Sequence, residues 1–130
     1  MATSTGEADR DLLVRFLEEC FGCAQACQEC AVVCWTAASA LSPEARNRLD
    51  VRCAEICERT ARLLSRQNSG DGAALRIQLE VCAETCRVTA DNTFRPGRME
   101  HRSAQQAASC RRCEVSCRRV LGLLTSEVTA

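Results

Sequence analysis

Several residue types that would point to a common function are missing from this chain of 130 residues. Lysine is absent, and all 17 basic residues are arginine. They are balanced by 17 acidic residues, so the net charge is zero. A zero net charge gives no support to a nucleic-acid partner or an anionic membrane surface. No apolar run is long enough to span a membrane. The single histidine, His101, leaves no Ser-His-Asp set or cysteine–histidine pairing with which to argue for a hydrolase.

The chain is also poor in aromatic residues and shows no export signal. Aromatic residues make up 3%, with no tyrosine and one tryptophan, so much of the interior must be built from leucine, valine, alanine and sulfur. Residues 1–10 are polar and small, and they lack the apolar segment of a signal peptide. We therefore expect a cytoplasmic protein, in a compartment where thiols stay reduced.

Cysteine is the residue that the chain has in excess, with 12 among 130 residues. Such a density is typical of secreted disulfide scaffolds and of metal proteins. In a reducing compartment, closely spaced cysteines are metal ligands or redox groups rather than disulfides. The sequence therefore favours a metal or redox role for them.

Three groups of helix-breaking residues divide the chain into four segments. Ser42-Pro43 is a helix start, with serine as the N-cap and proline at the first helical position. Residues 68–72 form a loop, and Pro96-Gly97 is the third break. The segments between them are rich in good helix formers and show no strand-like alternation. Helices are predicted over residues 9–40, 43–67, 71–92 and 97–125.

Short linkers make successive helices antiparallel. The predicted fold is all-α, an antiparallel four-helix bundle with a cysteine-lined core. We expect one metal-binding domain over residues 9–125 and disordered tails at residues 1–8 and 126–130.

The cysteines follow the stripe of each predicted helix that would face its neighbours. Along the first helix the seam positions advance by alternating steps of three and four residues, the spacing of a helix that packs in a bundle. Every cysteine stands where a bundle normally has leucine or valine. The candidate metal ligands are therefore Cys20, Cys23, Cys27, Cys30, Cys34, Cys53, Cys57, Cys82, Cys86, Cys110, Cys113 and Cys117.

The spacing favours a soft monovalent ion. Two thiols three or four residues apart lie on one helix face, about 6 Å apart at Cβ, and can hold one ion between them. Cu(I) accepts two or three thiolates, shares sulfur between ions and offsets one thiolate charge each, so we expect several Cu(I) ions per chain. Zinc and iron–sulfur sites take four ligands each, usually with some on loops, and a disulfide within one helix would be strained.

The two ends of the predicted bundle differ. One end gathers leucines with Phe16 into an ordinary apolar core. The other end, which we call the mouth, gathers Cys34, Trp35, Met99 and His101. We expect metal to enter at the mouth, with His101 as an entry or accessory ligand and Met99 as a weaker candidate. The alternative for His101 is an exposed polar side chain.

The cysteine pattern resembles that of bacterial copper storage proteins. The shared features are the Cys-x2-Cys-x3-Cys-x2-Cys-x3-Cys run from Cys20 to Cys34, the Cys-x3-Cys pairs of the second and third helices, and the run from His101 to Cys117. The resemblance implies a four-helix bundle whose thiolates hold many Cu(I) ions in a cytoplasmic homo-oligomer, a tetramer in the cytosolic branch of the family. The expected partners are copper ions and a copper chaperone or acceptor protein.

The chain departs from the family pattern in having fewer cysteines, so a smaller site is expected. Other residues stand at seam positions where more cysteines would be expected: Thr60, Leu64, Thr89, Thr93, Ser103 and Gln106. The leading hypothesis is Cu(I) storage and detoxification without turnover. A copper-cluster enzyme built on the same bundle is the second hypothesis, and an iron–sulfur electron carrier is the third.

Overall fold

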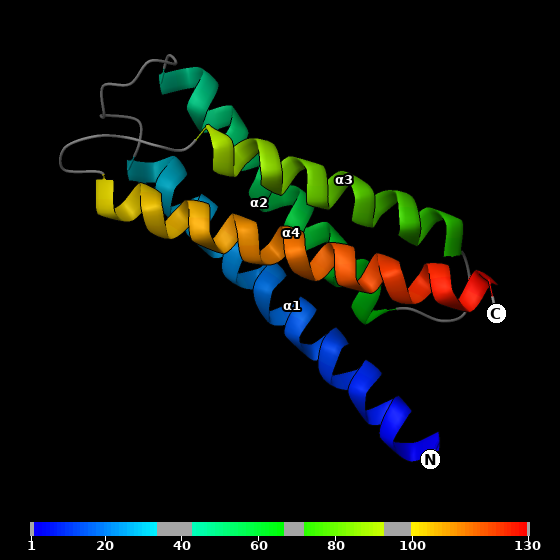
Figure 1. The fold of residues 1–130 in the computed structure, drawn as a ribbon. Helices are drawn as coiled ribbons and strands as arrows, with labels where there is room; N and C mark the ends of the chain where they lie inside the picture. The colour runs from blue at the N-terminus through cyan, green and yellow to red at the C-terminus, as the bar shows by residue number, and fades with distance from the viewer. Residues whose placement is uncertain (1, 34–42, 67–71, 93–99, 130) are drawn as a thin grey trace.

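Four helices account for nearly all of what the computed structural model describes, which is residues 2–33, 43–66, 72–92 and 100–129 (Figure 1). Helix α1 spans Ala2–Val33, α2 spans Pro43–Ser65, α3 spans Gly72–Asp91 and α4 spans Glu100–Thr129. No strand occurs in these residues, and the predicted all-α bundle with a cysteine-lined core is confirmed. None of the described helices is both long and apolar enough to cross a membrane.

Each helix packs against two neighbours around a common axis. Helix α1 lies against α2 and α4, and α3 lies against the same two helices, so α1 is diagonal to α3 and α2 is diagonal to α4. Successive helices run in opposite directions, and the first part of α1 extends away from the other three helices (Figure 1). All four helices therefore present one face to a shared interior.

Helices α2 and α3 and the start of α4 lie close to the predicted positions, and the predicted end of the first helix at residue 40 lies outside the described residues. Helix α2 begins at Pro43, as expected for a proline whose missing N–H costs nothing in the first turn. Helix α1 begins at Ala2 rather than at residue 9, and α4 continues to Thr129 rather than ending at residue 125. Neither extension contains a proline that would stop the helix. The division into a domain and two tails stays a prediction.

An apolar core occupies the end of the bundle where α1 enters it. Phe16, Leu75, Leu79 and Val120 are buried, and Leu13, Leu17, Leu121 and Leu124 pack against them while partly buried. Each fully buried side chain of this size stabilises the fold by roughly 1.5–3 kcal/mol. On α2, Leu64 faces this core, whereas its neighbour Leu63 is 41% exposed.

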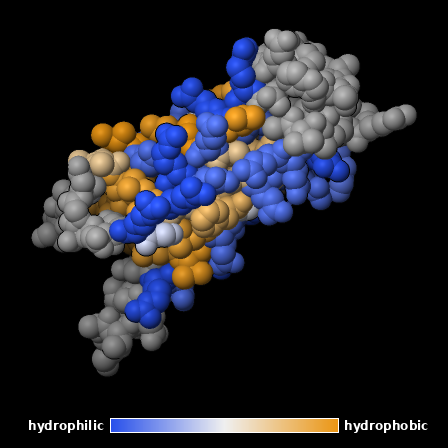
Figure 2. Space-filling model, turned by 180° about the vertical axis from the view of Figure 1, so that it is seen from behind, coloured by the Kyte–Doolittle hydropathy of each residue, from blue (hydrophilic) through white to orange (hydrophobic). Residues whose placement is uncertain are grey.

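The outer surface mixes hydrophilic and apolar side chains (Figure 2). Charged residues dominate the described outer positions of the helices. Large apolar side chains are exposed between them: Val14, Phe21, Val51, Leu63, Ile77, Val81 and Val115. These side chains lie on all four helices, so the apolar surface is spread around the bundle.

Candidate metal centre

Eleven cysteines line the middle of the bundle. Each is at most 2% exposed, and each is outside any disulfide. They are Cys20, Cys23, Cys27, Cys30, Cys53, Cys57, Cys82, Cys86, Cys110, Cys113 and Cys117. The twelfth, Cys34, lies outside the described residues. The predicted burial of cysteine along all four seams therefore holds wherever the structure describes it, and no disulfide joins any of the eleven.

Ten of these thiols form three groups of four, stacked along the bundle axis. Within each group all four sulfurs lie within 4.8 Å of one another. The first tetrad, next to the apolar core, is Cys20, Cys82, Cys113 and Cys117. The second tetrad is Cys23, Cys57, Cys86 and Cys113. The third tetrad, toward the mouth, is Cys23, Cys27, Cys53 and Cys110.

Two sulfurs connect the three tetrads into one column. Cys113 belongs to the first and second tetrads, and Cys23 belongs to the second and third. This sharing follows from the alternating three- and four-residue steps, because each step carries the seam about one helical turn along the axis. A bound ion in one tetrad would therefore share a ligand with an ion in the next.

The sulfur–sulfur distances suit shared metal ions. The Sγ atoms of Cys20 and Cys113, and those of Cys23 and Cys110, are 3.5 Å apart, and the pair Cys53–Cys86 is 4.0 Å apart. A disulfide would need about 2.05 Å. A metal–thiolate bond of about 2.3 Å, the length for zinc, lets two sulfurs on one ion be up to about 4.6 Å apart. The thiols are therefore close enough to share ions before any rearrangement.

Hydrogen bonds between the thiols shift their pKa values, some upward and some downward. The hydrogen bond between the Cys20 and Cys113 thiols, together with burial, raises the pKa of Cys20. Hydrogen bonds from Cys117, Cys20 and further thiols lower the pKa of Cys113. In the third tetrad, hydrogen bonding with Cys23 and Cys27 raises the pKa of Cys110, while hydrogen bonding with Cys110 lowers the pKa of Cys53. The pKa values of neighbouring thiols in one tetrad are therefore shifted in opposite directions.

A buried polar pair closes the column on the side of the mouth. The Gln106 Nε2 donates to Asp50 Oδ1 at 2.7 Å and lies 3.5 Å from the Cys27 sulfur. Both side chains are 1% exposed. Gln106 is among the predicted seam positions, but Asp50 is not, because a purely hydrophobic pattern favours its apolar neighbour Leu49. Asp50 stands three residues before Cys53, so the same spacing rule identifies it.

Threonines close the column elsewhere without leaving polar groups unsatisfied. The Thr60 hydroxyl donates to the Ile56 carbonyl at 2.7 Å and accepts from Gln78 Nε2 at 2.9 Å. The Thr89 hydroxyl donates to the Thr85 carbonyl at 2.7 Å. Both side chains are fully buried, as their seam positions predicted. They limit the thiol column to the middle of the bundle.

The residues expected at the mouth are only partly described. His101 is exposed and belongs to none of the three tetrads. Cys30 is buried one turn beyond Cys27, outside the tetrads. Cys34, Trp35 and Met99 lie outside the described residues. The entry role of His101 stays a prediction.

Comparison with known proteins identifies the family of this chain. A family model described as copper storage protein matches residues 9–122. The chain belongs to the copper storage protein family. The family is named for copper storage, and this member of it has twelve cysteines and a buried column of thiols. A search of curated proteins finds no match.

Solved copper storage protein structures from Streptomyces lividans match most of the chain. A cytosolic copper storage protein with five coppers is 34% identical with a TM-score of 0.80, covering 89% of this chain and 97% of that one. The Streptomyces protein loaded with ten copper equivalents is 35% identical with a TM-score of 0.79, covering 88% and 86%. A histidine-to-alanine variant of it is 35% identical with a TM-score of 0.80, covering 88% and 96%.

Proposed function

We propose that this protein binds, stores and detoxifies Cu(I) in the cytoplasm, holding several ions per chain on its buried cysteines. The observation that carries the proposal is the column of three tetrads, in which ten free, buried thiols lie close enough to share ions. The proposed ligands are the eleven described cysteines together with Cys34, and His101 is the proposed accessory ligand at the mouth. The copper-loaded Streptomyces structures support the choice of metal.

Charge balance favours Cu(I) over a divalent ion in this column. Three divalent ions, one in each tetrad, would supply six positive charges against ten buried thiolates. The surplus of negative charge would be costly, because none of the described buried residues is basic. Monovalent copper can match the thiolates one for one. Shared sulfurs also suit Cu(I), which is a soft ion that accepts bridging thiolates.

An anaerobic titration of the reduced protein with Cu(I), against a chromophoric competitor, tests the proposal. We expect several tightly bound ions per chain, with little change in the helix signal in circular dichroism because the bundle is already formed. Zinc titrated under the same conditions serves as the comparison and should bind fewer ions. Saturation at a single Cu(I) ion would contradict storage. A brown, reducible chromophore in protein as purified would instead favour an iron–sulfur carrier.

The resemblance to the cytosolic branch of the family supports a homo-oligomer, and a tetramer is proposed. Exposed apolar side chains such as Ile77, which is 61% exposed, supply surface that self-association would cover. Sedimentation equilibrium of the metal-free and copper-loaded chain checks this, with a tetramer expected in both. A copper chaperone or acceptor protein is the proposed partner for delivery.

A further inference from the structure

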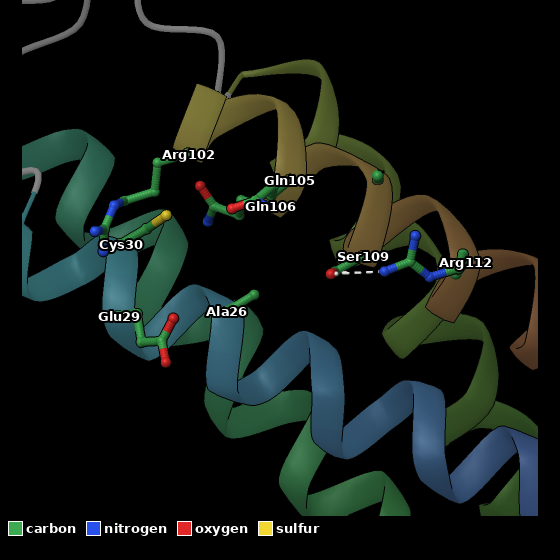
Figure 3. A pocket seen from close by; sticks show the side chains of 9 residues that line it. Ala26, Glu29, Cys30, Arg102, Gln105, Gln106, Ser109 and Arg112 are labelled. Atoms are coloured by element: carbon green, nitrogen blue, oxygen red, sulfur yellow. Dashed lines mark hydrogen bonds between the residues drawn. The ribbon is translucent and has the colours of Figure 1, made fainter. Parts of the chain in front are cut away.

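A pocket of about 430 Å³ opens on the side of the bundle between α1 and α4, next to the third tetrad (Figure 3). Its volume is within the range of sites that bind small molecules, roughly 300–1,000 Å³. Ala26, Ala108 and Ser109 leave it open because their side chains are small. The pocket reaches inward to Cys30 and Gln106, both of which are buried. It therefore joins the solvent to the mouth side of the thiol column.

The lining of the pocket combines four different chemical groups. Cys30 supplies a thiol, and Gln106 supplies Oε1, a buried acceptor with no hydrogen-bond partner among the described residues. Arg102 reaches from the start of α4 toward α1, on the side where the Cys30 sulfur lies (Figure 3). No ion pair is found for Arg102 among the described residues, whereas Arg112 is paired with Glu19 at 3.2 Å. Glu29 supplies a carboxylate on the α1 wall.

We propose that this pocket binds a small thiol with an amino-acid head group, which brings Cu(I) to the column as a thiolate complex. A carboxylate of the carrier pairs with Arg102, and its ammonium group pairs with Glu29. An N–H group of the carrier satisfies Gln106 Oε1, which removes the cost of an unpaired buried acceptor. A simple anion would match Arg102 alone, and a simple cation would match Glu29 alone, so the pair selects a zwitterion. This inference rests on the proposed copper function.

Transfer from the bound carrier is an exchange of thiolates with no change in oxidation state. The Cu–S bond to the carrier breaks and a Cu–S bond to Cys30 forms. The proton of the Cys30 thiol passes to the departing carrier sulfur, which leaves as the neutral thiol. Cys27 lies one helical turn further along the seam and belongs to the third tetrad, so the ion can move from Cys30 into the column by a second exchange.

Binding of S-methylglutathione to the metal-free, reduced full chain tests the pocket without copper. This probe keeps both carboxylates and the ammonium group of a peptide thiol, but its blocked sulfur cannot bind the ion strongly or exchange. By calorimetry or NMR titration we expect saturable binding that Arg102→Ala and Glu29→Gln each weaken roughly fivefold. Arg52→Ala is the matched control, since Arg52 is exposed on α2 outside this pocket, and it should bind the probe normally. Absent or non-saturable binding, or an unchanged affinity in Arg102→Ala, would overturn the proposal.

Loading kinetics test the role in transfer. The rate of loading from Cu(I)–glutathione should saturate as the concentration of the complex rises, and it should fall when S-methylglutathione is added. Cu(I)–mercaptoethanol is the control donor because it has no charged head group. Its loading rate should not change when the probe is added. A rate that rises linearly with concentration and shows no competition would overturn the proposal.

Copper capacity separates the carrier pocket from the storage function, because Arg102→Ala should still hold as many ions as the unmodified chain. If the unmodified chain binds no Cu(I) tightly, the storage function fails, whatever the probe does.

Discussion

At the level of single residues, Cys23 and Cys113 differ from the other cysteines because each belongs to two tetrads. Replacing Cys113 by serine removes a thiolate from the first and second tetrads together. Cys117→Ser is the matched control, since Cys117 is equally buried on the same helix but belongs to the first tetrad only. We expect Cys113→Ser to lose about twice as many tightly bound Cu(I) ions as Cys117→Ser. Anaerobic titration of both variants measures this, and equal losses would show that the tetrads do not share ligands.

The Asp50–Gln106 hydrogen bond should stabilise the metal-free fold. Gln106→Leu removes the amide that donates to a buried carboxyl oxygen, so we expect a loss of about 1–3 kcal/mol in the free energy of unfolding. Asp50→Leu should cost a similar amount. The double variant should cost less than the sum, because an apolar pair leaves no buried polar group unpaired. Urea unfolding of the four proteins measures the coupling, and strictly additive losses would contradict a direct interaction.

The candidate ligands could be predicted residue by residue, because a cysteine spaced three or four residues from the previous seam position lies on the buried face of its helix. The eleven described thiols are buried as expected. Asp50 was missed for a physical reason: a carboxyl group at a seam position is costly unless a partner on another helix supplies a hydrogen bond. That partner, Gln106, lies 56 positions later in the sequence. A rule based on hydrophobicity along one helix therefore selects Leu49 instead, which is only half-buried.

At the level of helices, the breakers predicted both the number of elements and their order. Pro43 sets the start of α2 because proline is tolerated only in the first turn of a helix. The start of α1 and the end of α4 could not be predicted as well, because no breaker marks either position. The bundle geometry followed from short linkers. The lateral pocket between α1 and α4 did not, since it depends on how small side chains from two distant segments meet.

The apolar end should hold the bundle together without metal. Leu79 on α3 is fully buried beside the first tetrad, and Leu79→Ala should lower the free energy of unfolding of the metal-free protein by about 2–5 kcal/mol. Ile77→Ala is the control on the same helix, because Ile77 is 61% exposed, and it should change stability by no more than about 0.5 kcal/mol. Urea unfolding monitored by helix content measures both. Comparable losses would place the anchoring core elsewhere.

For the whole molecule, the sulfur column couples copper binding to proton release. An ion binds thiolate, so each thiol that becomes a ligand must lose its proton. Hydrogen bonding to Cys113 and burial raise the pKa of Cys20 and of Cys86, whereas thiol neighbours lower the pKa of Cys113 and of Cys53. We therefore expect the first ions at the sulfurs whose pKa is lowered, and later ions must displace protons from the thiols whose pKa is raised.

The expected result is a copper affinity that rises with pH, and rises most for the last ions bound. Where the pKa of a thiol is above the working pH, each displaced proton makes binding up to about tenfold tighter per unit of pH. Competition titrations at two pH values on either side of neutrality, with the competitor calibrated at each, give the affinity change. A pH indicator in weak buffer should show proton release per ion increasing toward one as the column fills. An affinity independent of pH would contradict this account, because it would mean that copper binding displaces no protons. The thiols of the column form hydrogen bonds with one another and no disulfides, so protons are what an ion has to displace.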